Sequence, residues 1–143
     1  MIRQATLEDL ESVCSIEQQF GVEAFSKRSL RRFIMNGQAT VICENEILGY
    51  GIVMFRRNSL KARLYSIAIA KEHHGKKLGY SLLEALETLA IEKGMTTMLL
   101  EVAVSNLPAL SLYRSRGYQQ SAILDNYYND GGSAIKMKKV IAK

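Results

Sequence analysis

The chain has 143 residues, the size of one ordinary domain, and we expect a single domain over residues 1–143. Its 48% apolar and 23% charged residues are typical of a globular protein with a buried core. The longest uncharged stretch, Ile47 to Phe55, is far below the roughly 20 residues that span a bilayer, and Glu8, Asp9 and Glu11 interrupt any secretory signal. We therefore expect a cytoplasmic protein without a membrane partner.

The net charge of +5 indicates an anionic partner, for which a nucleic acid and a phosphorylated cofactor are the candidates. The basic residues form no long block, which argues against nucleic acid. The two cysteines, Cys14 and Cys43, lie far apart in apolar surroundings and indicate buried free thiols in a reducing compartment. Neither the cysteines nor the adjacent His73 and His74 have the spacing of metal ligands, so we expect no metal.

Hydrophobic periodicity and turn residues predict helices and strands in alternation along the chain. The expected strands are Ile2–Ala5, Ala39–Cys43, Ile47–Phe55, Leu64–Ile69, Met98–Val104 and Ile135–Ile141. The expected helices are one capped by Thr6 with Asp9, one from the cap Ser26 to Gly37, a long one with a Leu78, Leu82, Leu86 and Leu89 stripe ending at Gly94, and Pro108–Ser115. This order predicts a mixed sheet of the α/β class.

The segment between the strand ending at Ile69 and the leucine-striped helix has the character of an anion site. It contains Gly75 and Gly79, which let the backbone approach a ligand, and the cations Lys76 and Lys77. The free N–H groups and positive dipole end of a helix N-terminus favour a phosphate group. No Gly-Lys-Ser/Thr follows, so the loop is not a phosphate loop of the nucleotide-hydrolase kind.

Three polar residues in the following segment could carry chemistry. Glu101 is a lone carboxylate in an apolar strand, on the same face as Leu99 and Ala103. Burial would make such a carboxyl group a candidate general base, whereas at a splayed or peripheral strand it would simply face water. Tyr113 is either a core tyrosine or a proton donor, and Asn106 has the position of a helix N-cap.

The succession of strand, glycine-containing loop, long helix, Leu-Glu-Val strand, Asn106 and a Leu-Tyr-x-x-x-Gly-Tyr motif resembles the GNAT superfamily of N-acetyltransferases. Within it the chain is most similar to the RimI-like group, which acetylates protein N-termini. The resemblance runs from the Ile2-Arg3 opening through Asn126-Tyr127-Tyr128 to the last strand. It implies one domain with a central, mostly antiparallel mixed sheet that has helices on both faces.

The resemblance also implies roles for individual residues. The general base would be Glu101, and Tyr113 would be the general acid that protonates the leaving thiolate. The residues that would bind the cofactor are Ile67, Ala68 and Ile69 along its pantetheine arm, His74, Gly75, Lys76, Lys77, Leu78 and Gly79 around its pyrophosphate, and Asn106. Lys77 stands where the family motif has its first glycine.

The implied reaction moves an acetyl group from acetyl-CoA, as co-substrate, to a primary amine, and we expect this to be a protein or peptide N-terminus. Two alternatives stay open: a small amine such as a polyamine, an amino acid or an antibiotic, and a catalytically idle CoA-binding module. A polyamine would need an acidic pocket, for which Asp125, Asp130 and Glu23 are the candidates. The sequence also leaves a homodimer open.

Overall fold

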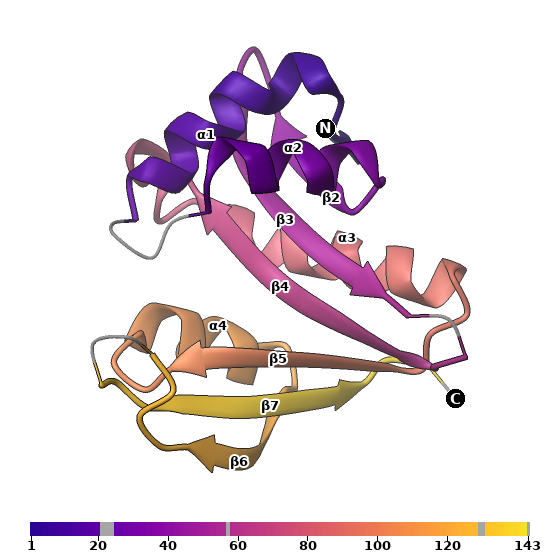
Figure 1. The fold of residues 1–143 in the computed structure, drawn as a ribbon, viewed down its shortest axis with the longest axis vertical. Helices are drawn as coiled ribbons and strands as arrows, with labels where there is room; N and C mark the ends of the chain where they lie inside the picture. Colours follow the sequence, from indigo (N-terminus) through magenta and orange to yellow (C-terminus); the bar gives the residue numbers. More distant parts are fainter. Residues whose placement is uncertain (21–24, 57, 129–130, 143) are drawn as a thin grey trace. The chain divides into compact units, whose positions relative to one another are not determined.

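The structure, a computed structural model, describes residues 1–20, 25–56, 58–128 and 131–142. The elements in these ranges, in chain order, are β1 (Ile2–Gln4), η1 (Leu7–Asp9), α1 (Leu10–Gln18), α2 (Lys27–Met35), β2 (Ala39–Cys43), β3 (Ile47–Phe55), β4 (Lys61–Ile69), η2 (Lys71–His73), α3 (Leu78–Glu92), β5 (Thr97–Ala103), α4 (Leu107–Ser115), β6 (Gln119–Leu124) and β7 (Ala134–Val140) (Figure 1).

The chain forms two compact units, one of residues 1–53 and 66–86 and the other of residues 54–65 and 87–143. Strand β4 and helix α3 contribute residues to both units. The strand order is β1-β2-β3-β4-β5-β7-β6. Strands β4 and β5 are parallel, whereas the pairs β1–β2, β2–β3, β5–β7 and β6–β7 are antiparallel, so the sheet is mixed and mostly antiparallel.

The first unit has helices on both faces of its strands. Apolar side chains of α1 and α2 pack against β2 and β3 on one face (Figure 1). On the other face Leu86 of α3 approaches Gly51 so closely that a Cβ atom there would lie 2.6 Å from the Leu86 Cδ1 atom. The absence of a side chain at Gly51 is therefore what lets α3 pack directly on β3.

Side-chain caps fix where the first helices begin. Asp9 accepts the backbone N–H of Thr6 at 2.8 Å, which completes the predicted capping box, and forms an ion pair with Arg3 at 2.8 Å. The hydrogen bonds from Arg3 lower the pKa of the Asp9 carboxyl group. Ser26 caps α2, because its Oγ atom accepts the Ser29 N–H at 3.1 Å.

A buried carboxylate, Glu17, ties α1 to two later parts of the chain. One of its oxygens accepts the hydroxyl of Tyr50 on β3, and the other accepts the backbone N–H of Phe25 at 2.8 Å. Glu17 is 7% exposed and Tyr50 is fully buried. Burial, followed by the hydrogen bond to Glu17, raises the pKa of Tyr50.

The sheet of the second unit has a covered face and an open face. The covered face of β5 carries Met98, Leu100 and Val102, which are at most 5% exposed. The alternate residues of β5, including Leu99 and Glu101, are half-buried. Because side chains alternate along a strand, these form the second, open face. Helix α4 belongs to the same unit, and its Leu110 and Tyr113 are buried.

On the covered side a second buried carboxylate, Glu87, holds two cations. Its Oε1 atom accepts the Nη2 of Arg116 and lies 2.9 Å from the Nζ of Lys139. The Lys139 Nζ also lies 5.7 Å from the centre of the Tyr118 ring. Burial, together with the charge of Glu87, raises the pKa of Tyr118. One carboxylate thus joins α3, the end of α4 and β7.

The expected fold class, a mixed α/β sheet with helices, is confirmed. Two expectations about strands are wrong. Strand β4 begins at Lys61 rather than Leu64. Strand β6 was not expected at all, because Gln119–Leu124 lies exposed at the sheet edge and has no alternation of apolar and polar residues. None of the helices in the described part of the chain is long and apolar enough to cross a bilayer.

Candidate functional site

The loop before α3 has the backbone of an anion site. Gly75 has a φ of +84° and Lys77 a φ of +60°, so both lie in the left-handed region. A Cβ atom on Gly75 would meet no heavy atom within 4 Å, which leaves its backbone open to a ligand. The first α-helical hydrogen bond runs from Ser81 N to Lys77 O at 3.2 Å. The N–H groups of the preceding first turn therefore have no acceptor within the helix, and this donor set fits a phosphate group.

The two histidines of this segment, His73 and His74, each lie within hydrogen-bonding distance of other groups. The Nε2 of His74 lies 2.7 Å from the carbonyl oxygen of Ile69, which can only accept, so Nε2 carries the proton. His73 Nδ1 lies 3.1 Å from Lys76 Nζ, and His73 Nε2 lies 3.1 Å from a carboxylate oxygen of Glu46. Both rings lie at the surface of the loop and also make these contacts, because His74 is exposed and His73 is half-buried.

The end of β4, Ile67–Ile69, is half-buried and closely packed in the first unit. A Cβ atom on Gly49 of β3 would lie 2.7 Å from the carbonyl oxygen of Ala68, so the two backbones are in close contact there. The Ala70 N–H donates to Leu48 O at 2.9 Å. The register of β4 with β5 covers the positions Lys61–Arg63, before this segment.

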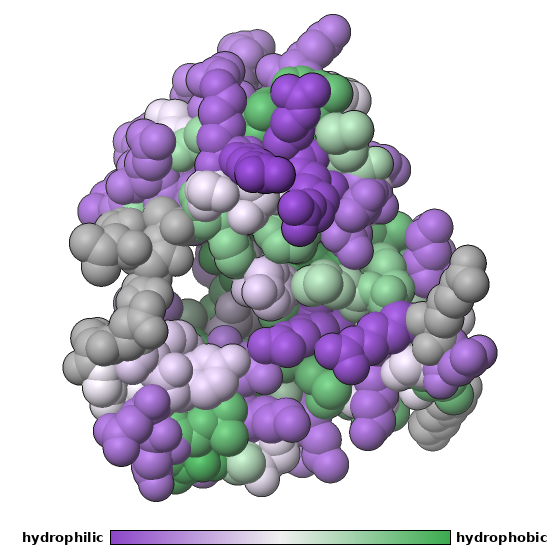
Figure 2. Space-filling model, viewed as in Figure 1, coloured by the Kyte–Doolittle hydropathy of each residue, from purple (hydrophilic) through white to green (hydrophobic). Residues whose placement is uncertain are grey.

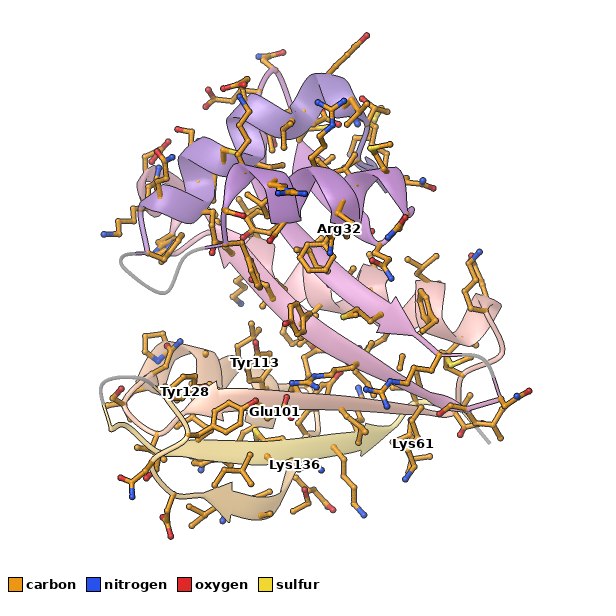
Figure 3. All side chains as sticks on the ribbon, in the orientation of Figure 1. Arg32, Lys61, Glu101, Tyr113, Tyr128 and Lys136 are labelled. Carbon is orange, nitrogen blue, oxygen red and sulfur yellow. The ribbon has the colours of Figure 1, made fainter. Side chains whose placement is uncertain are left out.

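Glu101 lies on the open face of β5 in the second unit, in an environment that the sequence did not predict. Its side chain is 17% exposed, and its Oε2 atom forms an ion pair with the Nη2 of Arg63 at 2.9 Å. Arg63 also lies over the ring of Tyr65, 5.4 Å from the ring centre. In the register with β7, Glu101 is opposite Lys136. The carboxylate is therefore neither fully exposed nor isolated, and it lies between cationic residues of both neighbouring strands (Figure 3).

Tyr113 is buried on α4, with 7% of its surface exposed. Its ring centre lies 5.8 Å from that of Tyr118. Burial raises the pKa of the Tyr113 hydroxyl, and Tyr128 raises it further, so the group keeps its proton throughout the neutral range. Tyr128 itself packs edge-on against Tyr127, with ring centres 5.1 Å apart. Tyr113, Tyr128 and Glu101 all belong to the second unit (Figure 3).

Asn106 is the N-cap of α4, as its position indicated. Its Oδ1 atom accepts the Ala109 N–H at 3.3 Å, and Pro108 lies in the first helical turn, where its missing N–H costs nothing. The capping bond uses the side-chain oxygen, so the amide nitrogen is left to donate to another group.

The expected site residues fall into two groups. The loop His74–Gly79 and the β4 segment belong to the first unit, and Glu101, Asn106 and Tyr113 belong to the second. The sequence missed Arg63 and Lys136 beside Glu101. Polar and apolar residues alternate from Lys61 through Ala62 and Arg63 to Leu64. This pattern could have extended the predicted strand toward its start and included Arg63 in it. In the described ranges no group of three or more His, Cys, Asp or Glu side chains could hold a metal ion.

Comparison with known proteins gives consistent results over the whole chain. The family model described as "Acetyltransferase (GNAT) family" matches residues 7–118. A Bacillus subtilis protein named "Putative ribosomal protein bS18-alanine N-acetyltransferase" is 32% identical over 135 residues, which cover 92% of this chain and 88% of that protein.

Two crystal structures extend the comparison to the fold. Ard1 from Thermoplasma volcanium has a TM-score of 0.89 and 25% identity, covering 100% of this chain and 98% of the other. The ribosomal-protein-S18-alanine N-acetyltransferase of Escherichia coli has a TM-score of 0.86 and 27% identity, covering 100% and 94%. With the family model matching most of its length, the chain belongs to the acetyltransferase (GNAT) family.

Proposed function

We propose that this protein transfers the acetyl group of acetyl-CoA to the α-amine at the N-terminus of a protein or peptide. The observation that carries the proposal is the similarity, over 92% of the chain, to a protein named for acetylation of a ribosomal protein alanine. The crystal structure of the ribosomal-protein-S18-alanine N-acetyltransferase of Escherichia coli, at 27% identity, supports the same acceptor class.

Most of the residues proposed to bind the cofactor belong to the first unit. In this proposal the N–H groups at the start of α3 and the ammonium groups of Lys76 and Lys77 hold the pyrophosphate. The left-handed backbone at Lys77 supports this role, because it is the conformation that glycine favours and Lys77 stands where the family motif has glycine. Backbone groups of Ile67–Ile69 would bind the pantetheine arm, and Asn106 would add a side-chain contact.

The proposed chemistry needs a base and an acid from this chain. Bound acetyl-CoA supplies a thioester carbonyl for attack by the amine. The Glu101 carboxylate accepts the proton of the incoming amine, directly or through a water molecule. Its Oε2 atom is held by Arg63, so Oε1 is the oxygen that would take the proton. Tyr113, which burial keeps protonated, then donates its proton to the departing sulfur.

The choice of acceptor amine depends on how easily the amine loses its proton. An α-amine has a pKa near 8, whereas a lysine side chain has one near 10.4. At neutral pH an α-amine therefore presents a much larger fraction of the uncharged form that can attack. A small amine is the alternative acceptor, because Glu101 and Tyr113 would serve it equally well.

An assay of CoA release tests this function directly. The panel contains peptides with free N-termini, the same peptides with blocked N-termini and an internal lysine, spermidine, and free amino acids, and mass spectrometry locates the acetylated atom. We expect acetylation at the free α-amines. Acetylation of spermidine or of blocked peptides alone would overturn the acceptor, and no binding of CoA at millimolar concentration in calorimetry would overturn the enzyme.

We also propose that residues 1–143 act as one N-acetyltransferase domain in the cytoplasm. Helix α3 and strand β4 each run through both compact units, which supports folding as one domain. The free and buried Cys14 and Cys43 fit a reducing compartment.

A further inference from the structure

The open face of the second unit's sheet is basic. By register it carries Lys61 and Arg63 on β4, and Lys136 and Lys138 on β7, with Glu101 between them on β5. We call these four cations the basic face. Figure 2 views the molecule from the side of this face and shows hydrophilic residues over β4, β5 and β7. Figure 3 labels Lys61, Glu101 and Lys136 on it.

The basic face keeps an excess of positive charge after its one ion pair. Arg63 pairs with Glu101, and for Lys61, Lys136 and Lys138 the described residues offer no carboxylate partner. Two other acids of this unit lie elsewhere, because Glu87 binds cations on the covered side and Glu92 is in α3. Three lysines without an ion pair among the described residues therefore share the face of the candidate base, with Lys136 opposite Glu101 and Lys138 and Lys61 further along the sheet.

Unpaired cations of one sign on a single sheet face repel one another, so a bound anionic partner would relieve the repulsion. Lys136 is half-buried, which increases the cost of leaving its charge without a partner. Both facts suggest that the partner which binds at Glu101 carries negative charge.

We propose, resting on the proposed function, that the basic face selects acceptors whose second to fourth residues include aspartate or glutamate. An amine bound at Glu101 starts a chain that extends by about 3.3 Å per residue. Lys136 is directly opposite Glu101 in the register, and Lys138 is two residues further along β7, about 7 Å away. In a peptide that runs from Glu101 along β7 toward Lys138, acidic side chains at the second to fourth positions would thus meet Lys136 and Lys138.

The same face argues against a polyamine acceptor, since a polycation would approach Lys61, Lys136 and Lys138. Of the three acids that could have formed a polyamine pocket, Glu23 and Asp130 lie outside the described residues. Asp125 is exposed just after β6.

The test compares kcat/KM for peptides that share an N-terminal alanine and differ only in residues two to four: acidic, neutral or basic. An exposed ion pair is worth roughly 1.5- to 5-fold in binding, so two such contacts should favour the acidic over the neutral peptide by about 2- to 25-fold at low salt. The preference should shrink at high salt, because screening weakens exposed pairs.

Charge reversal locates the effect. Lys138→Glu, two positions along the register from Glu101, should abolish or invert the preference while the neutral peptide is still acetylated. The matched control is Lys93→Glu, which makes the same kind of charge change on an exposed residue after α3 and should keep the preference. A circular dichroism spectrum and melting curve establish that each variant is folded.

Each other outcome has a definite meaning. Equal kcat/KM for acidic and basic peptides, or an unchanged preference in the Lys138→Glu variant, overturns the proposal and leaves N-terminal acetylation intact. A single-stranded oligonucleotide that binds the basic face more tightly than the acidic peptide assigns the face to nucleic acid and also overturns it. Failure to acetylate any α-amine in the panel is failure of the proposed function itself.

Discussion

Replacing Lys77 by glycine should stabilise the protein, because Lys77 has a left-handed backbone at the start of α3. A residue with a Cβ atom pays about 1–2 kcal/mol for this conformation, and Lys77 has a φ of +60°. Glycine avoids that cost but loses roughly 0.5–1 kcal/mol more conformational entropy on folding. The balance predicts that Lys77→Gly raises the free energy of unfolding by about 0.5–1 kcal/mol, or the melting temperature by roughly 2 °C.

The control for this prediction is Lys77→Ala, which removes the same ammonium group and keeps the Cβ atom. Urea unfolding curves of the two variants should therefore differ by about 1 kcal/mol in favour of glycine, while alanine stays close to the wild type. An alanine variant as stable as the glycine variant would show that the backbone at position 77 is not strained.

The same pair of variants measures what the Lys77 charge contributes to cofactor binding. Both lack the ammonium group, so both should bind CoA more weakly than the wild type, and the affinity of both should fall less steeply with added salt. Calorimetry at two salt concentrations makes the comparison. If both variants keep the wild-type affinity and salt dependence, Lys77 does not meet a phosphate.

Three further perturbations test other parts of the molecule. Tyr113→Phe should lower kcat by roughly 100-fold and leave the affinity for acetyl-CoA nearly unchanged in calorimetry; wild-type turnover would mean that Tyr113 is only a core residue. Glu87→Gln should cost about 3 kcal/mol in urea unfolding, because Arg116 and Lys139 lose their shared buried counter-charge; a loss below about 1 kcal/mol would contradict this. Because the pKa of Asp9 is lowered in the folded state, its contribution is present above the unfolded pKa of about 3.9 and is lost as the pH falls further. The stability difference between the wild type and Asp9→Asn should therefore be constant from pH 5 to 8 and shrink below about pH 4, and a difference that does not change with pH would refute this assignment.

Local sequence signals were sufficient for most of the fold. Strands β2 and β3 have the expected bounds, Ala39–Cys43 and Ile47–Phe55, because two apolar runs flank a short polar turn. The caps at Thr6 and Ser26 were also predicted correctly, since a cap depends only on residues up to three positions away. Strand β6 could not be predicted, because its stability comes from pairing with β7 rather than from an apolar pattern of its own.

The candidate site was predictable residue by residue but not in its interactions. The order of motifs along the sequence identified Glu101 and Tyr113 as the candidate base and acid. The structure adds that Tyr113 is buried and that Glu101 is half-buried. The partner Arg63 lies 38 positions before Glu101 in the sequence, and only the parallel register of β4 with β5 brings their strands together. The charge of +5 was known from composition, yet the placement of four cations on the face of Glu101 depends on which residues of three strands share that face.

Glu17 also has a consequence for the engineering of this protein. One oxygen of its carboxylate accepts the hydroxyl of Tyr50 on β3, which holds the end of α1 against that strand. The other oxygen accepts the N–H of Phe25, so one side chain contacts the chain on both sides of residues 21–24. A substitution at Glu17 would remove both hydrogen bonds at once, one of them to a fully buried tyrosine. Glu17 and Tyr50 are therefore the positions to keep constant in a library of variants of this unit.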